Sequence, residues 1–482
     1  MSASTLLNLL GYLNLILAGT MSFPLLVDWL YDEPMGEAFL LSTAITAAAG
    51  FLLILLFKRA PRRDLTHRDG FAIVAFGWLS AAFFGALPYL FSRSLPFLAD
   101  AFFESASGFT TTGATVLADV ERQYHAVLFW RSFTQWLGGM GIVLLSLAVL
   151  PYLGVGGMQL YKAEVPGPTY DKLRPRISET ARILWQVYVF LSVLEILFLF
   201  WGGMNLFDAF CHTFTTMATG GFSTKNASIE QFANPFLEYV MIFFMILAGA
   251  NFALHYEFLR GNFKSLWKNE EFRFYLMILL SATFLITLNL HHDRLLDFSN
   301  AVRLALFQAT SIMTTTGYTS ADYETWPFFS QYLLLLLMFV GGCAGSTGGA
   351  IKCVRVLVLI KQGRKELSRL IHPRAVIPVK MAGKAIPPET LQGIWGLFFL
   401  YLCIFGVASL LLALMGQDML TAVSAVAATL GNVGPGLGTI GPSENYAHLP
   451  MAAKWILSAC MLLGRLEIYT LMVLLLPDFW RK

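Results

Sequence analysis

The chain has 482 residues, of which 56% are hydrophobic and only 13% are charged. Charged residues are about half as frequent as in an average soluble domain, which indicates a membrane protein. The net charge is only +3 and no basic stripe is present, so we expect membrane lipid as a partner and no nucleic acid.

Long apolar runs follow one another along the chain, and each is close to the ~20 residues needed to cross a bilayer. The first run has no basic n-region and no small-residue cleavage site, so we interpret it as a retained span rather than a signal peptide. The sequence therefore predicts an all-α polytopic membrane protein with ten transmembrane spans. These are expected at 6–27, 38–57, 71–91, 125–150, 181–202, 236–259, 272–290, 328–360, 391–415 and 452–476.

Lysine and arginine indicate the orientation. In a ten-span arrangement, five segments on one side hold 25 of the 33 basic residues; they are 58–70, 160–182, 260–273, 352–384 and 481–482. By the positive-inside rule this side is the cytoplasm. The first loop, 28–37, has four acidic residues and no basic one, as expected of an external loop. Both termini are therefore expected in the cytoplasm.

Four short amphipathic helices are predicted between later spans, each too short to cross a membrane. They are expected at 98–109, 207–217, 300–313 and 418–429. Each is followed by a small-residue segment, which we call a Thr/Gly segment. The four Thr/Gly segments are 110–114, 218–222, 314–318 and 431–435.

The chain from residue 71 therefore repeats one unit of span, short helix, Thr/Gly segment and span. Residues 1–70 form two extra N-terminal spans, and the repeats occupy 71–180, 181–271, 272–389 and 390–482. Small residues that let helices pack closely would explain one or two such segments. Four favour re-entrant loops with pseudo-symmetry around one pore, because irregular backbone at membrane depth must be buried or line a wet cavity.

Glycine in each Thr/Gly segment can adopt a positive φ at little steric cost, so that successive carbonyl oxygens turn toward one axis. The expected ring positions are Gly113, Gly220, Gly317 and Gly434, with Gly431 as the alternative register in the fourth segment. The two residues before each glycine would add further carbonyl oxygens. These are Thr111, Thr112, Ala218, Thr219, Thr315, Thr316, Asn432 and Val433. Such oxygens can replace the water shell of a cation.

A second glycine cluster, 341–349, interrupts the predicted span 328–360. Its residues of interest are Gly341, Gly342, Gly345, Ser346, Thr347, Gly348 and Gly349. Each glycine costs roughly 1 kcal/mol relative to alanine inside a helix, and the run is longer than a straight crossing requires. The cluster therefore indicates either a broken helix with a loop near the pore axis or a close helix crossing at small residues.

Charged residues inside the predicted spans need partners. Arg465 lies midway along the last span, where an unpaired cation would cost a few kcal/mol or more. Glu467 is two residues away and would point elsewhere on a helix. Lys352 either contacts the glycine cluster or marks the cytoplasmic boundary. Glu195, in the fifth span, suggests either proton coupling or an interhelical hydrogen bond.

With these motifs in place, the sequence resembles the Trk/Ktr/HKT superfamily of potassium transporters, and within it the bacterial Trk-type pore subunits. Its most specific stretches are 131–141, 341–349, 431–436 and 464–470. The two extra spans favour the Trk branch over the shorter Ktr branch. The resemblance implies K⁺ uptake across the bacterial cytoplasmic (inner) membrane, with K⁺ bound at the Thr/Gly segments and K⁺ and Rb⁺ passing better than Na⁺. It also implies that the loop 341–349 is an intramembrane gate, with Arg465 facing the pore beside it.

Members of this family assemble as homodimers on a cytosolic nucleotide-binding ring of the TrkA type. The basic segment 361–384 would either dock that ring or attract anionic lipid headgroups. The chain has no Gly-x-x-x-x-Gly-Lys-Ser/Thr motif and no strand-linked Gly-x-Gly-x-x-Gly. No cofactor is therefore expected on the chain itself, and any effect of ATP, ADP or NAD would come through the partner.

An alternative function is ion-coupled potassium symport, with H⁺ or Na⁺, by alternating access. Inverted repeats and paired broken helices would indicate it, whereas the sequence shows four units in one orientation and one plainly broken span. An enzyme is not expected, because the chain lacks a His-Glu-x-x-His motif and a nucleophile constellation.

Overall fold

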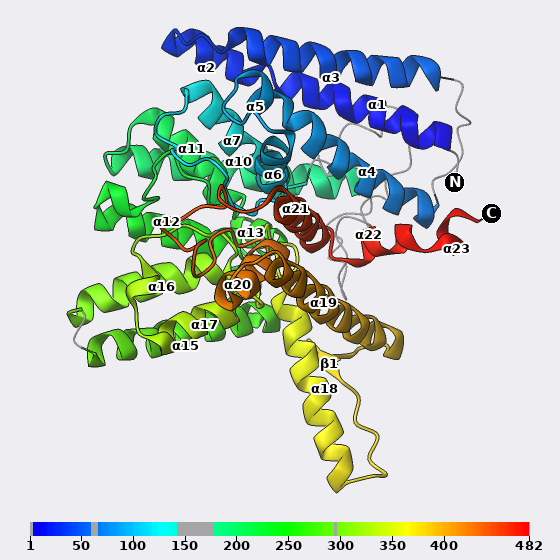
Figure 1. Cartoon of the computed structure of the whole chain (residues 1–482). Helices are drawn as coiled ribbons and strands as arrows, with labels where there is room; N and C mark the ends of the chain where they lie inside the picture. The colour runs from blue at the N-terminus through cyan, green and yellow to red at the C-terminus, as the bar shows by residue number, and fades with distance from the viewer. Residues whose placement is uncertain (1–2, 59–65, 142–176, 294–295, 482) are drawn as a thin grey trace.

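The computed structural model describes residues 3–58, 66–141, 177–293 and 296–481, and they are mainly helical (Figure 1). The helices before residue 293 are α1 Ala3–Thr20, α2 Phe23–Tyr31, α3 Gly36–Leu56, α4 His67–Gly85, α5 Leu87–Phe91, α6 Leu98–Phe109, α7 His125–Gly139, α10 Ile177–Trp201, α11 Leu206–Met217, α12 Pro235–Ala248, α13 Phe252–Leu259, α14 Lys264–Lys268 and α15 Glu270–His292. Those after it are α16 Phe298–Met313, α17 Phe328–Leu337, α18 Cys353–Ile371, α19 Pro388–Leu414, α20 Met419–Leu430, α21 Met451–Arg465, α22 Tyr469–Met472 and α23 Pro477–Trp480. A two-stranded hairpin, β1 Lys380–Met381 and β2 Lys384–Ala385, follows α18.

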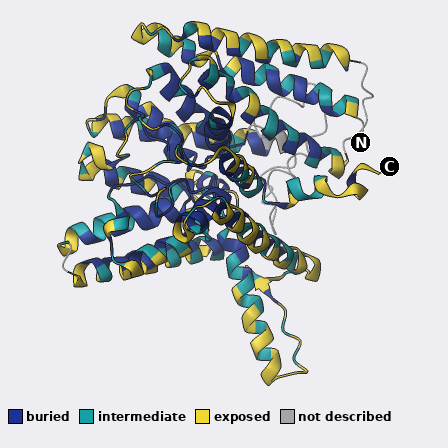
Figure 2. Cartoon of the chain, in the orientation of Figure 1, coloured by how far each residue is buried: buried dark blue, intermediate teal, exposed yellow. Residues whose placement is uncertain are grey.

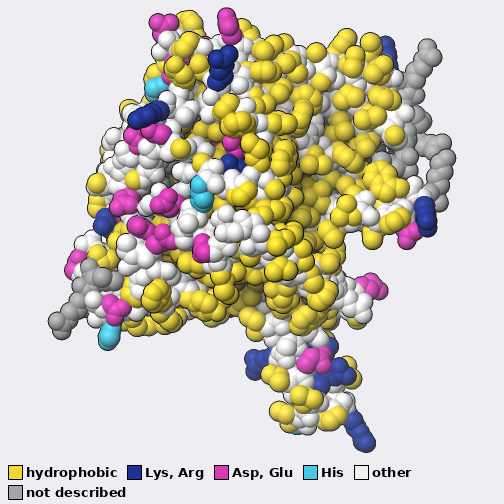
Figure 3. All heavy atoms as spheres, viewed as in Figure 1, with side chains coloured by type: hydrophobic (Ala, Val, Ile, Leu, Met, Phe, Trp, Pro, Cys, Tyr) yellow, Lys and Arg dark blue, Asp and Glu magenta, His cyan; other side chains and the backbone are white. Residues whose placement is uncertain are grey.

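Six of the described helices are long and apolar enough to cross a membrane, or up to eight spans if each of two bent helix pairs counts as one. Hydrophobic side chains cover much of the visible surface, and α18 projects from it with basic side chains (Figure 3). Two of the ten predicted spans are represented by the shorter helices α7 and α17. The second half of the predicted span 125–150 lies outside the described residues, so a count of ten remains a prediction.

The N-terminal helices α1 and α3 pack closely along one side of the molecule (Figure 1). Gly11 and Gly50 make this approach possible, because a Cβ atom on either would lie only 2.8 Å from the backbone oxygen of the other. Small residues at a helix contact are typical of membrane proteins, where close packing takes the place of the hydrophobic effect. Helix α1 also contacts α4, and there the buried Asn14 accepts a hydrogen bond from Ser80 at 2.7 Å.

The four predicted short helices are present as α6, α11, α16 and α20, with ends within two residues of those expected. Figure 2 shows the buried residues gathered at the centre, where these helices lie. Three of them begin at a side-chain N-cap: Asn205, Asp297 and Asp418 each accept a hydrogen bond from a backbone N–H in the first turn. Such caps define the start of a helix.

The predicted spans that follow the Thr/Gly segments are broken more often than expected. The sequence indicated one plain break, at the glycine cluster 341–349, and the structure has it between α17 and α18. Two more breaks occur, a bend of 102° between α12 and α13 and one of 110° between α21 and α22. The expectation of a single broken span is therefore wrong. Hydropathy stays high through both bends, and the Asn251 side chain caps α13 by accepting from the Ala253 N–H at 2.8 Å, which replaces a lost helical bond.

Candidate functional site

The four Thr/Gly segments share one backbone conformation. In each, two residues with a left-handed φ flank one that lacks it, and the second of the two is a glycine. These pairs are Thr111 and Gly113 (φ 54° and 83°), Thr219 and Gly221 (54° and 74°), Thr315 and Gly317 (61° and 81°), and Asn432 and Gly434 (54° and 102°). A non-glycine residue with positive φ is uncommon, so its recurrence at four equivalent positions indicates one built motif.

This pattern corrects the register of the second segment. Gly220 was the expected ring position, but the left-handed glycine there is Gly221. Counted from the residues that end the short helices (Thr110, Ala218, Thr314 and Gly431), Gly220 aligns with Thr112 instead. Two adjacent glycines cannot be told apart by composition, which explains the error. In the fourth segment Gly434 has the left-handed conformation, whereas Gly431 has φ −79° and ends α20.

The segments lie next to one another in a closed ring. A Cβ atom added to each left-handed glycine would come closer than 3.0 Å to a backbone oxygen of the following segment, and the fourth segment meets the first. The pairs are Gly113 with Gly220 O, Gly221 with Thr316 O, Gly317 with Val433 O, and Gly434 with Thr112 O. Four equivalent carbonyl oxygens, those of Thr112, Gly220, Thr316 and Val433, therefore lie around one ring. A side chain at any of the four glycines would collide with backbone.

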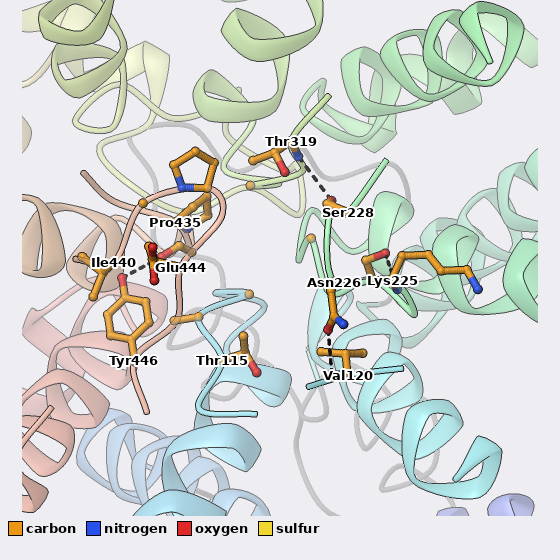
Figure 4. A pocket seen from close by; sticks show the side chains of 18 of the residues that line it. Thr115, Val120, Lys225, Asn226, Ser228, Thr319, Pro435, Ile440, Glu444 and Tyr446 are labelled. Carbon is orange, nitrogen blue, oxygen red and sulfur yellow. Dashed lines mark hydrogen bonds between the residues drawn. The ribbon is translucent and has the colours of Figure 1, made fainter. Parts of the chain in front are cut away.

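The ring opens into a cavity lined by the four ring glycines and the loops that follow them (Figure 4). A hydrogen bond joins each of these loops to the loop of the next segment, and the fourth loop to the first. The joining hydrogen bonds are Val120 N–H to Asn226 Oδ1 (2.8 Å), Thr319 N–H to Ser228 Oγ (3.3 Å), Tyr323 O–H to Gly436 O (2.8 Å) and Tyr446 N–H to Thr115 O (2.8 Å). The cavity is thus walled by all four segments.

Buried polar side chains hold the ring from behind. Asn432 donates to the Thr112 hydroxyl at 2.9 Å, which links the last segment to the first. Gln135 of α7 donates to Gly220 O at 2.7 Å and accepts from the Phe222 N–H at 3.2 Å. Sequence reasoning did not find Gln135. The signal available was a polar residue within the predicted span 125–150, where an unpaired amide would be costly.

The glycine cluster 341–349 packs against the ring near the ends of the short helices. Its Gly349 N–H donates to the Thr315 hydroxyl at 2.7 Å, and the Thr347 hydroxyl donates to Met217 O at 3.0 Å. Its Cys343 N–H donates to Gly249 O at the α12–α13 bend at 2.8 Å. The loop therefore contacts the third segment, the last residue of α11 and a neighbouring broken helix.

Arg465 has the kind of partner that an intramembrane arginine needs. Its Nη1 donates to Thr347 O of the cluster at 2.6 Å, and its Nη2 donates to Gly138 O at 2.6 Å and Gly139 O at 2.9 Å. Lys352 donates to Gly348 O, so it contacts the cluster. Glu467, as expected, points elsewhere and pairs with Arg355 of α18.

Glu195 lies apart from these contacts, fully buried in α10. Neither of its carboxyl oxygens has a hydrogen-bond partner of good geometry in the part of the chain that the structure describes. The Thr216 hydroxyl of α11 lies close to the Glu195 carboxyl, so the interhelical hydrogen bond and the proton-coupling role both stay predictions.

Known proteins match this architecture along the whole chain. A family model described as TrkH, cation transport protein, matches residues 35–482. The Trk system potassium uptake protein TrkH of Salmonella typhimurium is 44% identical over 478 residues, which cover 98% of both chains. The TrkH of Vibrio parahaemolyticus is 42% identical over 490 residues, covering both chains fully. The crystal structure of the potassium transporter TrkH from Vibrio parahaemolyticus superimposes with a TM-score of 0.89 at 39% identity, over 100% of each chain.

Proposed function

Because the chain belongs to the TrkH family of cation transport proteins, we propose that it takes up potassium ions through the ring formed by its four Thr/Gly segments. It is accordingly a membrane transporter and not an enzyme. The relatives described above are named potassium uptake proteins. The observation that carries the proposal is the closed set of contacts between each left-handed glycine and the carbonyl oxygen of the next segment. Rings of backbone carbonyls can replace the hydration shell of K⁺.

The proposed K⁺ ligands are the carbonyl oxygens of the two residues before each ring glycine. In the corrected register these are Thr111, Thr112, Thr219, Gly220, Thr315, Thr316, Asn432 and Val433. Ala218 leaves the predicted set, because it ends helix α11. Each of the four repeats, 71–180, 181–271, 272–389 and 390–482, then contributes one quarter of the filter. The filter is short, so we expect K⁺ and Rb⁺ to pass, and Na⁺ to pass less well.

We propose that the glycine cluster 341–349 is the gate of this pore. Its hydrogen bonds to Thr315 and Met217 support a position next to the filter, on its cytoplasmic side. Arg465 would hold the closed state, because one guanidinium joins the cluster to the end of α7. Its planar fork can donate to several carbonyl oxygens at once, which a lysine cannot do as well.

The proposed setting is the bacterial cytoplasmic membrane, with both termini in the cytoplasm. The start of α1 and the end of α23 lie on the same side of the molecule (Figure 1), where Arg68 donates to Arg481 O at 3.0 Å. A homodimer bound to a cytosolic nucleotide-binding ring of the TrkA type would regulate the gate. The names of the relatives refer to a Trk system, which implies further components. The projecting helix α18 and the β1–β2 hairpin supply a basic surface for such a partner.

Proton- or sodium-coupled symport is the second candidate. The additional helix breaks at α12–α13 and α21–α22 favour it, because discontinuous helices are common in alternating-access transporters.

Uptake of labelled Rb⁺ into proteoliposomes distinguishes the two mechanisms. A pore should take up Rb⁺ when an inside-negative voltage is imposed, and added K⁺ should compete. A symporter should accumulate Rb⁺ when a proton or sodium gradient is imposed at zero voltage. Lack of any Rb⁺ uptake by correctly inserted protein would contradict both.

A further inference from the structure

A buried ion pair lies immediately behind the first Thr/Gly segment. Glu104 of the short helix α6 has no exposed surface, and Arg131 of α7 is 3% exposed. The Arg131 Nε donates to Glu104 Oε1 at 2.6 Å. Burying two charges costs several kcal/mol each before they attract one another, so such a pair is weak evidence for stability on its own. Its other contacts show what it holds.

The Glu104 carboxylate holds the loop that leaves the first segment. It accepts a hydrogen bond from the Thr115 hydroxyl at 2.9 Å and another from the Val116 N–H at 2.9 Å. These two residues come directly after Gly113 and Ala114. With Arg131 included, donors from three different residues therefore surround this carboxylate.

The Arg131 guanidinium reaches the neighbouring segment. Its Nη1 donates to Ser223 O at 2.8 Å, and its carbon lies 3.6 Å from the centre of the Phe222 ring. Phe222 and Ser223 follow the ring glycine Gly221 directly. Arg131 and Ser223 both line the cavity above the ring. Arg131 thus connects the residues that follow the first segment, through Glu104, to those that follow the second.

His212 and Gln308 occupy the position of Glu104 on α11 and α16, and in α20 Ser424 lies one residue before that position, next to Ala425. His212 contacts the Ser223 hydroxyl at 2.9 Å, Gln308 donates to Ala321 O at 3.3 Å, and Ser424 donates to Leu437 O at 2.9 Å. None of these three contacts is an ion pair, and each joins two residues of the same repeat. Among these four sets of contacts, only the one at the first segment contains an ion pair and reaches a neighbouring segment.

We propose that Arg131 and Glu104 are positioning residues for ion selectivity, which fix the separation of the first and second segments. This rests on the proposed function of the ring as a potassium filter. The Arg131 fork donates in two directions, to Glu104 and to Ser223 O, and a single ammonium group cannot reproduce that geometry. Loss of the fork should let the two segments shift, so that carbonyl oxygens adapt to a smaller ion.

The test compares Rb⁺ and Na⁺ uptake in proteoliposomes for Arg131→Lys, Thr115→Val and the parent. Arg131→Lys keeps the charge, and Thr115→Val keeps both charges while it removes one hydrogen bond to Glu104. We expect the Rb⁺/Na⁺ flux ratio to fall about fivefold in Arg131→Lys, as expected from the loss of one hydrogen bond, and to fall less in Thr115→Val. If Arg131→Lys does not fold, Thr115→Val decides the question.

The matched control is a second ion pair, which joins Asp100 of the same short helix to Lys454 of α21 at 2.6 Å. Lys454→Gln should lower thermal stability and leave the Rb⁺/Na⁺ ratio at the parental value. The proposal is overturned if both test variants keep the parental ratio, or if Lys454→Gln lowers it equally. A parent protein without Rb⁺ uptake would overturn the transport function itself, and this assignment with it.

Discussion

At the residue scale, the two adjacent glycines of the second segment have different surroundings. A Cβ atom on Gly221 would meet Thr316 O in the backbone of the next segment, and its φ is 74°. A Cβ atom on Gly220 would meet only the end of the Gln135 side chain. A side chain end can move, whereas the ring backbone cannot move without losing its shape.

We therefore expect Gly221→Ala to abolish Rb⁺ uptake or its selectivity over Na⁺, and Gly220→Ala to have the milder effect. Gly416→Ala is the control, because Gly416 has φ 88° with no neighbouring atom within 4 Å. It should carry only the backbone cost of about 1–2 kcal/mol. Flux assays on the three variants, after a check of membrane insertion, decide the register; equal loss in Gly220→Ala and Gly221→Ala would contradict it.

The loops that follow the first two Thr/Gly segments provide a pH-dependent contact between the first two repeats. Asn226 donates to Asp119 Oδ1 at 2.9 Å, and this hydrogen bond lowers the pKa of the partly exposed Asp119 carboxyl below its usual value of 3.8. A lowered pKa in the folded state stabilises the fold above the unfolded pKa, and this contribution is lost as the pH falls through the folded pKa.

Acidification below about pH 4, the usual range for an aspartate, should therefore loosen this contact. The protection of the loop 114–124 in hydrogen exchange, measured relative to the intrinsic exchange rate at each pH, should decrease across this range in the parent. In Asn226→Ala this protection should already be low at neutral pH and should depend less on acid. A parent loop whose protection does not respond to acid would show that the contact does not matter for its stability.

At the scale of elements, the proposed gate joins the glycine cluster to Arg465. Arg465→Ala removes the guanidinium that donates to Thr347 O, Gly138 O and Gly139 O. Deletion of 344–348 removes the cluster itself. Each change should raise Rb⁺ flux through the isolated pore protein, without its cytosolic partner.

The combination of the two changes should be far from additive, because either one removes the same barrier. The four proteins to compare are the parent, each single variant and the double variant. If the deletion variant folds and its flux stays at the parental level, the cluster is a packing feature rather than a gate. An increase for Arg465→Ala alone would indicate only a charge effect on passing cations.

Sequence reasoning found the short helices well and the helix breaks poorly, for one physical reason. Caps and apolar periodicity are local, so the side chains of Asn205, Asp297 and Asp418 already indicate where helices begin. The bend after Ala248 occurs within an apolar run and depends on contacts with the loop 341–349, about 95 residues away. Likewise, Glu104 and Arg131 lie 27 residues apart, and no helical spacing rule connects them.

At the scale of the whole molecule, the chain closes on itself where the fourth segment meets the first. Asn432 carries this closure, since its side chain donates to the Thr112 hydroxyl and to Met461 O, both at 2.9 Å. It also has a left-handed φ of 54°, which asparagine tolerates better than most residues.

Asn432→Ala should lower thermal stability because it loses two buried hydrogen bonds, at about 1 kcal/mol each, and strains the backbone. Asn432→Gly loses the same bonds without the strain, so the difference between the two variants measures the backbone term. Thermal-shift curves of the purified proteins give both values. Equal stability of Asn432→Ala and the parent would mean that closure does not depend on this side chain.

The closed ring is made by one chain, and its four quarters are therefore separate in the gene. In a channel of four identical subunits, one codon change alters every wall of the pore at once. Here the side chains that bond to the loops after the four segments already differ in charge and size. They are Glu104, His212, Gln308 and Ser424. In the proposed filter, a mutation can thus alter one side of the ring while the other three keep the parental geometry, so ion preference can evolve in small steps while the pore still conducts.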